Sequence, residues 1–147
     1  MKPTILVIDD DEAVRYSIHR IMQREGFAVA VAADGREGLE LLDRVFPALV
    51  ITDLIMPEME GLETITELRK RRSELPIIAI SGGGRVIRPG YLDFAKKLGA
   101  SDVLAKPFEP EDLVAAVKRQ LRPIASPARS SQVRVLYDRA LRADRPI

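Results

Sequence analysis

The sequence predicts one α/β domain, a doubly wound five-stranded parallel sheet with helices on both faces. Two observations carry this prediction. Short apolar segments rich in β-branched residues alternate five times with segments whose apolar residues recur at helical spacing, a pattern typical of successive βαβ units. The 147 residues are 46% hydrophobic and 31% charged, which suits a single soluble globular domain.

The first half of the chain begins with a strand and then alternates. Residues 5–8 form a continuous apolar run, as expected of a central parallel strand. Apolar residues then recur with a period near 3.6 over a helix that begins at Glu12 and that Gly26 ends. Residues 27–31 form a second short strand, in which the larger side chains of Phe27, Val29 and Val31 alternate with alanine, and Asp34-Gly35 opens a second helix that closes at Pro47.

The second half repeats the alternation. Apolar and β-branched runs predict three further strands, and each is followed by a segment with helical spacing. Pro110 suits the first turn of the last helix. The predicted elements are, in order, a strand at 48–52, a helix at 60–72, a strand at 77–80, a helix at 91–98, a strand at 102–105 and a helix at 110–121.

Composition excludes several classes of function. The absence of cysteine excludes disulfides, thiol catalysis and cysteine-ligated metals. A single histidine, His19, excludes a multi-histidine metal site and lies off the apolar stripe of its helix, so we expect it at the surface. A net charge of +1 gives no field favouring nucleic acid, and we find no signal peptide or membrane span. We expect a cytoplasmic protein.

The composition changes after Arg122. Residues 123–131 are rich in Pro, Ala and Ser, which indicates a linker, and 133–142 have helical spacing with basic residues around it. We therefore divide the chain into a domain at 1–122 and a basic tail at 123–147. The tail could dock on its own domain, bind a partner or be partly disordered, and a solvated helix is the simplest interpretation.

Polar residues follow four of the predicted strands. In an open α/β sheet the carboxyl ends of the strands meet at one edge, where ligands bind. Three carboxylates would crowd there, and a divalent cation such as Mg²⁺ or Mn²⁺ would relieve their repulsion. A hydroxyl and an ammonium complete a clamp for phosphoryl transfer, with Asp53 as the nucleophile. These residues are Asp9, Asp10, Asp53, Ser81 and Lys106.

The same residues give the chain a family resemblance. Over residues 4–121 it resembles the receiver domain of two-component response regulators, whose flavodoxin-like fold has the strand order 2-1-3-4-5. The resemblance rests on Asp9-Asp10 after the first strand, the segment from Asp53 to Gly61, Ser81, and Lys106-Pro107-Phe108. Each piece alone is a weak motif, and their order and spacing together are specific.

The resemblance implies how a metal would be held. Asp10 would ligate Mg²⁺ directly, and Asp9 would help through water. Asp53 and the backbone carbonyl of Ile55 would complete the protein ligands. Mn²⁺ could replace Mg²⁺.

The resemblance also assigns the phosphoryl chemistry. Asp53 would accept the phosphoryl group from a histidine kinase or phosphotransfer protein, Ser81 would hydrogen-bond that group and Lys106 would pair with it. The Lys106–Pro107 peptide bond is expected to be cis.

Two departures from the family pattern concern signalling. Val103 stands where receivers commonly carry a switching Tyr or Phe, so we expect readout through the glycine-rich loop at 82–90 and the helix after it. Ile55 and Gly83 stand where polar residues promote hydrolysis of the acyl phosphate, so we expect slow self-dephosphorylation.

The leading functional prediction is a stand-alone receiver, not an enzyme, that signals by phosphorylation-dependent protein binding. We expect no direct contact with nucleic acid or membrane, and a homodimer could form through the last two helices and the fifth strand. Two alternatives stay open. One is the receiver half of a truncated transcriptional regulator, and the other is a haloacid dehalogenase-like phosphatase with Asp9 as nucleophile.

Overall fold

The computed structural model describes residues 2–54, 61–81 and 90–121, without the side chains of Tyr91 and Leu92. Strands and helices alternate through these residues, as the sequence predicts. The elements are β1 (Thr4–Ile8), α1 (Glu12–Arg24), β2 (Ala28–Ala32), α2 (Gly35–Val45), β3 (Leu49–Asp53), α3 (Gly61–Arg71), β4 (Ile77–Ser81), α4 (Tyr91–Leu98), β5 (Asp102–Ala105) and α5 (Pro110–Leu121).

The five strands form one parallel sheet in the order β2-β1-β3-β4-β5, which confirms the predicted fold. β3 is the central strand, and all five of its residues are buried, Asp53 at its end included. Because every strand runs in the same direction, all their carboxyl ends meet at one edge. That edge is where the predicted site residues lie.

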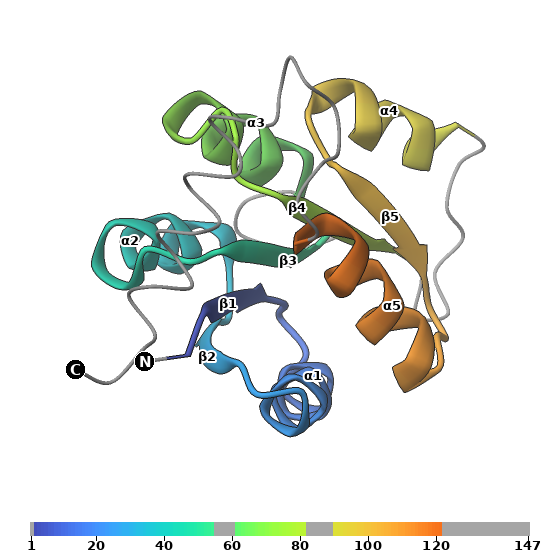
Figure 1. The fold of residues 1–147 in the computed structure, drawn as a ribbon. Helices are drawn as coiled ribbons and strands as arrows, with labels where there is room; N and C mark the ends of the chain where they lie inside the picture. Colours follow the sequence, from blue (N-terminus) through green and yellow to red (C-terminus); the bar gives the residue numbers. More distant parts are fainter. Residues whose placement is uncertain (1, 55–60, 82–89, 122–147) are drawn as a thin grey trace, which may run out of the picture.

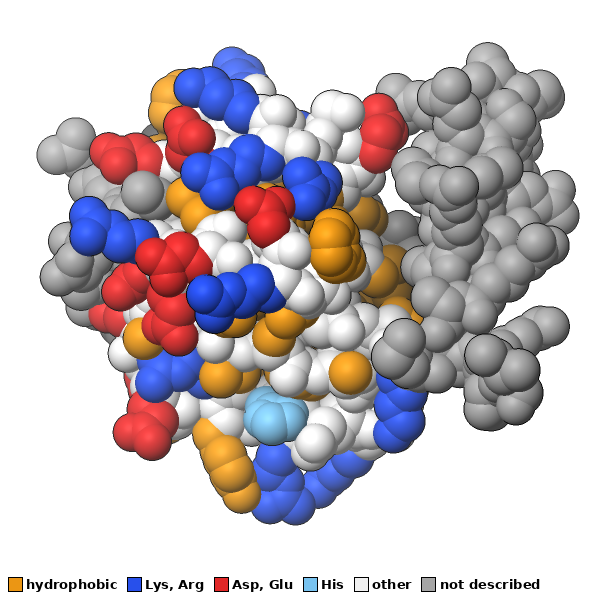
Figure 2. Space-filling model, turned by 90° about the vertical axis from the view of Figure 1, so that its left-hand side faces the viewer, with side chains coloured by type: hydrophobic (Ala, Val, Ile, Leu, Met, Phe, Trp, Pro, Cys, Tyr) orange, Lys and Arg blue, Asp and Glu red, His pale blue; other side chains and the backbone are white. Residues whose placement is uncertain are grey.

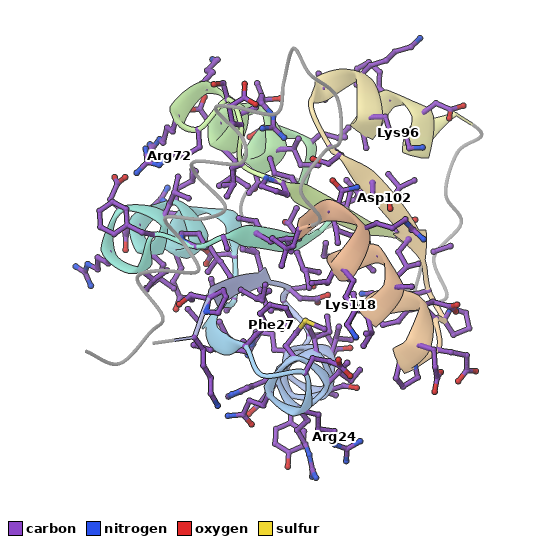
Figure 3. All side chains as sticks on the ribbon, in the orientation of Figure 1. Arg24, Phe27, Arg72, Lys96, Asp102 and Lys118 are labelled. Carbon is purple, nitrogen blue, oxygen red and sulfur yellow. The ribbon has the colours of Figure 1, made fainter. Side chains whose placement is uncertain are left out.

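Helices cover both faces of the sheet (Figure 1). α1 and α5 pack on one face, and α2, α3 and α4 pack on the other. Two hydrophobic clusters fill these two interfaces. In the cluster beneath α1 and α5, Met22 and Leu113 pack against strand residues, and Phe27 adds its ring (Figure 3). In the other, Leu42 and Leu68 pack on the opposite side of the sheet.

Local sequence explains where the first two helices begin. The carboxylate of Asp11 accepts a hydrogen bond from the backbone N–H of Ala13 at 2.9 Å, so it caps α1. Asp34 caps α2 through the N–H of Glu37 at 2.9 Å, and the carboxylate of Glu37 accepts in return from the N–H of Ala33 at 3.0 Å. This arrangement resembles a capping box, except that Glu37 reaches the N–H of the residue before the cap.

Two strands are displaced by one residue from the prediction. β2 spans Ala28–Ala32 instead of 27–31, because its bounds follow its pairing with β1 along the edge of the sheet. β3 spans Leu49–Asp53 instead of 48–52, because Asp53 still pairs with Ile80 of β4. The nucleophile proposed from sequence is therefore the last residue of the strand.

One face of the molecule has the character of an ordinary solvent-facing surface. Acidic and basic side chains are interspersed across it, with isolated hydrophobic side chains between them (Figure 2). His19 is partly exposed on α1, in line with the surface position expected for it. No helix in the described ranges has both the length and the apolarity that crossing a membrane requires.

Several predictions concern parts of the chain outside the described residues. They are the carbonyl of Ile55, residues 82–89 of the proposed readout loop with Gly83 among them, and the tail at 123–147. The division into a domain and a tail stays a prediction.

Candidate functional site

The strand ends bring four predicted site residues together. The register of β1 against β3 places Asp9, which follows β1, beside Asp53 at the end of β3. Ser81 ends β4, and Lys106 directly follows β5. The N–H of Lys106 donates to the carbonyl of Ser81 at 2.6 Å, so the backbone itself ties these last two positions together.

Three carboxylates converge at this edge. Asp9, Asp10 and Asp53 each offer an oxygen, and the three oxygens lie within 4.8 Å of one another. Asp9 and Asp53 are buried, whereas Asp10 is exposed to solvent. An all-oxygen donor set with one accessible carboxylate fits Mg²⁺ or Mn²⁺, which take few protein carboxylates and keep several waters.

The ammonium of Lys106 reaches into the cluster from the end of β5, at the edge of the sheet. Its Nζ lies 3.1 Å from Oδ2 of Asp9 and 3.6 Å from Oδ2 of Asp53. The side chain of Lys106 is only 13% exposed, so solvent screens both ion pairs weakly. Lys106 therefore contacts the two buried carboxylates together, with Asp9 the nearer.

Burial affects the titration of Asp9. Burial raises the pKa of its carboxyl above the ordinary value. The N–H of Asp11, which donates to Oδ1 at 2.9 Å, and the ammonium of Lys106 both act in the opposite direction without cancelling the effect. Burial thus makes the charged form of Asp9 less favourable in the folded protein than it is in water.

Ser81 has an unused hydroxyl. Among the buried side-chain nitrogen and oxygen atoms of the described residues, only Ser81 Oγ lacks a hydrogen-bond partner. Leaving such a group buried and unpaired costs about 1–3 kcal/mol. The register of β4 against β3 places this hydroxyl beside the strand end that carries Asp53.

Arg15 makes a contact with the site that the sequence did not predict. Its Nη1 donates to the backbone carbonyl of Asp9 at 2.7 Å from the first half of α1. Nothing in the sequence distinguishes Arg15 from the other arginines on helix surfaces. Only the structure reveals that its side chain turns back toward the strand end.

Two further positions bear on the resemblance. The Lys106–Pro107 peptide bond is cis, as expected. Val103 is partly buried on β5 and packs against the cluster beneath α2, α3 and α4. The position expected to hold a switching aromatic ring is thus occupied by a small apolar side chain.

Comparison with known proteins identifies the family of the chain. The sequence model of the response regulator receiver domain matches residues 5–118. The chain is 41% identical over 123 residues to the response regulator MprA of Mycolicibacterium vanbaalenii, a match that covers 83% of this chain and 52% of the relative. It is 40% identical over 119 residues to MprA of Mycobacterium leprae, covering 80% and 50%. The chain thus spans about half the length of these relatives.

Solved structures agree with the sequence match. The chemotaxis protein CheY4 of Vibrio cholerae superimposes with a TM-score of 0.74 at 30% identity, covering 81% of this chain and 98% of that one. A CheY-like receiver domain protein from Methanospirillum hungatei gives a TM-score of 0.76 at 31% identity, covering 82% and 94%. With the strand order and the family match over most of its length, the chain belongs to the response regulator receiver domain family of two-component systems.

Proposed function

We propose that Asp53 accepts a phosphoryl group from a histidine kinase or phosphotransfer protein in a Mg²⁺-dependent reaction. The observation that carries the proposal is the convergence of Asp9, Asp10 and Asp53 at one strand edge with Lys106 between the two buried carboxylates. Burial keeps Asp53 from free solvent while leaving it at the end of its strand. Such a site suits phosphoryl transfer, where positioning and charge neutralisation provide most of the catalysis.

The transfer needs little covalent chemistry from the protein. An oxygen of Asp53 forms a bond to phosphorus as the bond from phosphorus to the donor's imidazole nitrogen breaks. The electron pair of the broken bond stays on that nitrogen, and a ring protonated on its other nitrogen leaves as neutral imidazole. Lys106 balances negative charge on the transferring group, and Ser81 Oγ donates a hydrogen bond to one of its oxygens. Hydrolysis later returns the carboxylate and releases inorganic phosphate.

The metal would be held by Asp9, Asp10 and Asp53, with the carbonyl of Ile55 outside the described residues. When bound, Mg²⁺ supplies positive charge to the developing phosphoryl oxygens. The disfavoured charged form of Asp9 is consistent with a site made to receive a cation.

The wider role is part of the same proposal. Phosphorylation would change which protein this domain binds, in the cytoplasm, without the domain acting as an enzyme on another substrate. A stand-alone receiver would signal through protein partners, whereas a receiver within a longer transcriptional regulator would control contact with nucleic acid through another part of that regulator. The family match favours either form over the haloacid dehalogenase-like alternative.

The test is phosphorylation by acetyl phosphate in Mg²⁺, followed by borohydride reduction and peptide mapping. Trypsin separates the candidate nucleophiles, because Asp9 falls in peptide 1–15 and Asp53 is the only aspartate in peptide 45–69. We expect the label in peptide 45–69 and its loss in Asp53→Asn. Label in peptide 1–15 would instead support the phosphatase alternative and overturn the proposal.

A further inference from the structure

The turn that carries the metal-binding carboxylates is fixed by hydrogen bonds on both sides. The N–H of Asp9 donates to the carbonyl of Ala32 at 3.1 Å, which holds the turn to β2. Its carboxylate accepts from the N–H of Asp11 at 2.9 Å. The backbone carbonyl of Asp9 accepts a hydrogen bond from Nη1 of Arg15 at 2.7 Å. Arg15 thus supplies the side-chain contact to the peptide that joins Asp9 to Asp10.

This contact has the properties of a strong restraint. A guanidinium donating at 2.7 Å forms a charge-assisted hydrogen bond, which is stronger than a neutral one. It is partly buried, so water competes for it weakly. The peptide that it orients leads directly into Asp10, whose carboxylate is exposed and therefore depends on the backbone for its direction.

We propose that Arg15 is a positioning residue for the divalent cation site, acting through the Asp9 carbonyl to aim the carboxylates of Asp9 and Asp10. The proposal rests on the proposed function, because it assumes that these carboxylates bind the cation. Groups that orient metal ligands commonly change metal affinity by about 10- to 100-fold when removed. Arg15 itself touches neither the metal nor the phosphoryl group in this scheme.

If Arg15 acted only through its charge, its removal would change the metal affinity in the opposite direction. A guanidinium near a cation site repels the cation, so removing the charge alone would tighten metal binding. Removing a positioning contact would weaken it. The sign of the change in affinity therefore separates the two roles.

The experiment measures Mn²⁺ affinity of the full chain from the electron paramagnetic resonance signal of free Mn²⁺, which needs no phosphoryl donor. We expect Arg15→Ala to weaken binding about tenfold and Arg15→Lys, which keeps a charged donor, to recover part of the loss. Arg20→Ala is the matched control, since Arg20 lies on the same helix and its guanidinium hydrogen-bonds and stacks with the exposed Tyr16. It should bind Mn²⁺ as the wild type does.

A second readout separates positioning from general damage to the fold. In acetyl phosphate reactions, Arg15→Ala should need about tenfold more Mg²⁺ for half-maximal rate and approach the wild-type rate at saturation. The melting temperature of Arg15→Ala in EDTA should lie no more than about 4 °C below that of Arg20→Ala, the shift expected for the loss of one hydrogen bond.

The outcomes distinguish this inference from the proposed function. Equal or tighter Mn²⁺ binding by Arg15→Ala overturns the inference and leaves phosphorylation at Asp53 intact. Weaker binding, with no label on Asp53 in the wild type, supports the inference and overturns the phosphoacceptor. A wild-type protein that binds no Mn²⁺ overturns the inference together with the metal site.

Discussion

Gly61 offers the sharpest test of how the fold holds the site edge. It is buried at the start of α3, and its N–H donates to the carbonyl of Leu54 at 3.0 Å. A Cβ built on Gly61 would overlap the carbonyl oxygen of Asp53 and the Cα of Leu54, and would lie 2.6 Å from the carbonyl carbon of Leu54. All three atoms belong to the backbone at the end of β3 and directly after it, so none can rotate away as a side chain can.

The magnitude follows from two opposing effects. Replacing Gly by Ala in a helix gains about 0.4–1 kcal/mol when the site tolerates it. Overpacking that forces backbone to move costs about 1–3 kcal/mol or more, and three overlapping atoms place Gly61→Ala at the upper end. We expect a net loss of about 2 kcal/mol, which for a chain of this length lowers Tm by about 4–8 °C.

The matched control is Gly38→Ala within α2. A Cβ there would meet the end of the Ile8 side chain, including Cγ1 at 2.8 Å, and a side chain can change rotamer where backbone cannot. We expect this variant to lose about 1 kcal/mol, at the lower end of the cost of overpacking, and so less than Gly61→Ala. Both variants are compared by thermal unfolding and by the rate of labelling with acetyl phosphate.

Gly61→Ala should also slow labelling, because the displaced backbone carries Asp53, whereas Gly38→Ala should not. The reasoning is refuted if Gly61→Ala melts within about 2 °C of the wild type, or if Gly38→Ala is the more damaged of the two.

Two other predictions concern the remaining site residues. Burial raises the pKa of Asp9 in the folded state, so this group lowers stability as pH rises above 3.8, the ordinary pKa of the carboxyl. Asp9→Asn should therefore match or exceed the wild type in Tm at neutral pH in EDTA. The difference in Tm should shrink toward acid pH. A scan from about pH 4 to about pH 8 that leaves the wild type more stable throughout would contradict this. Ser81→Ala should leave the unphosphorylated protein as stable as the wild type or more so, while slowing labelling by about 10- to 100-fold. Ser81→Thr, which keeps the hydroxyl, should label well, and equal rates for all three proteins would exclude a role for Ser81.

The sequence predicted the sheet well because its signals are local. Continuous apolar runs and helical periodicity identified every strand and helix of the described residues, and the family resemblance supplied the strand order. The errors were at boundaries. β2 lies one residue later than predicted because its limits depend on pairing with β1, and a pairing partner distant in sequence leaves no local signal.

The sequence likewise predicted the positions of the site residues but not the contacts among them. Strand-end positions were enough to place Asp9, Asp53, Ser81 and Lys106 at one edge. The distances among them were not predictable, and Lys106 lies nearer to Asp9 than to Asp53. The hydrogen bond from Arg15 was also invisible, because it depends on how a long flexible side chain turns back over a capped helix start. Such contacts follow from rotamers and turn geometry, which a residue pattern does not specify.

Two features of the site are unfavourable for the resting protein. The carboxylate of Asp9 is buried enough to raise its pKa, and the hydroxyl of Ser81 is buried without a partner among the described residues. A fold selected for stability alone would place apolar side chains at both positions, since incompletely compensated polar groups lower stability. Both features lie beside Asp53, and ligands of complementary chemistry would relieve them, a cation for Asp9 and a phosphoryl oxygen for Ser81. That coincidence is expected of a binding site and not of a structural ion-pair cluster, whose groups would already satisfy one another.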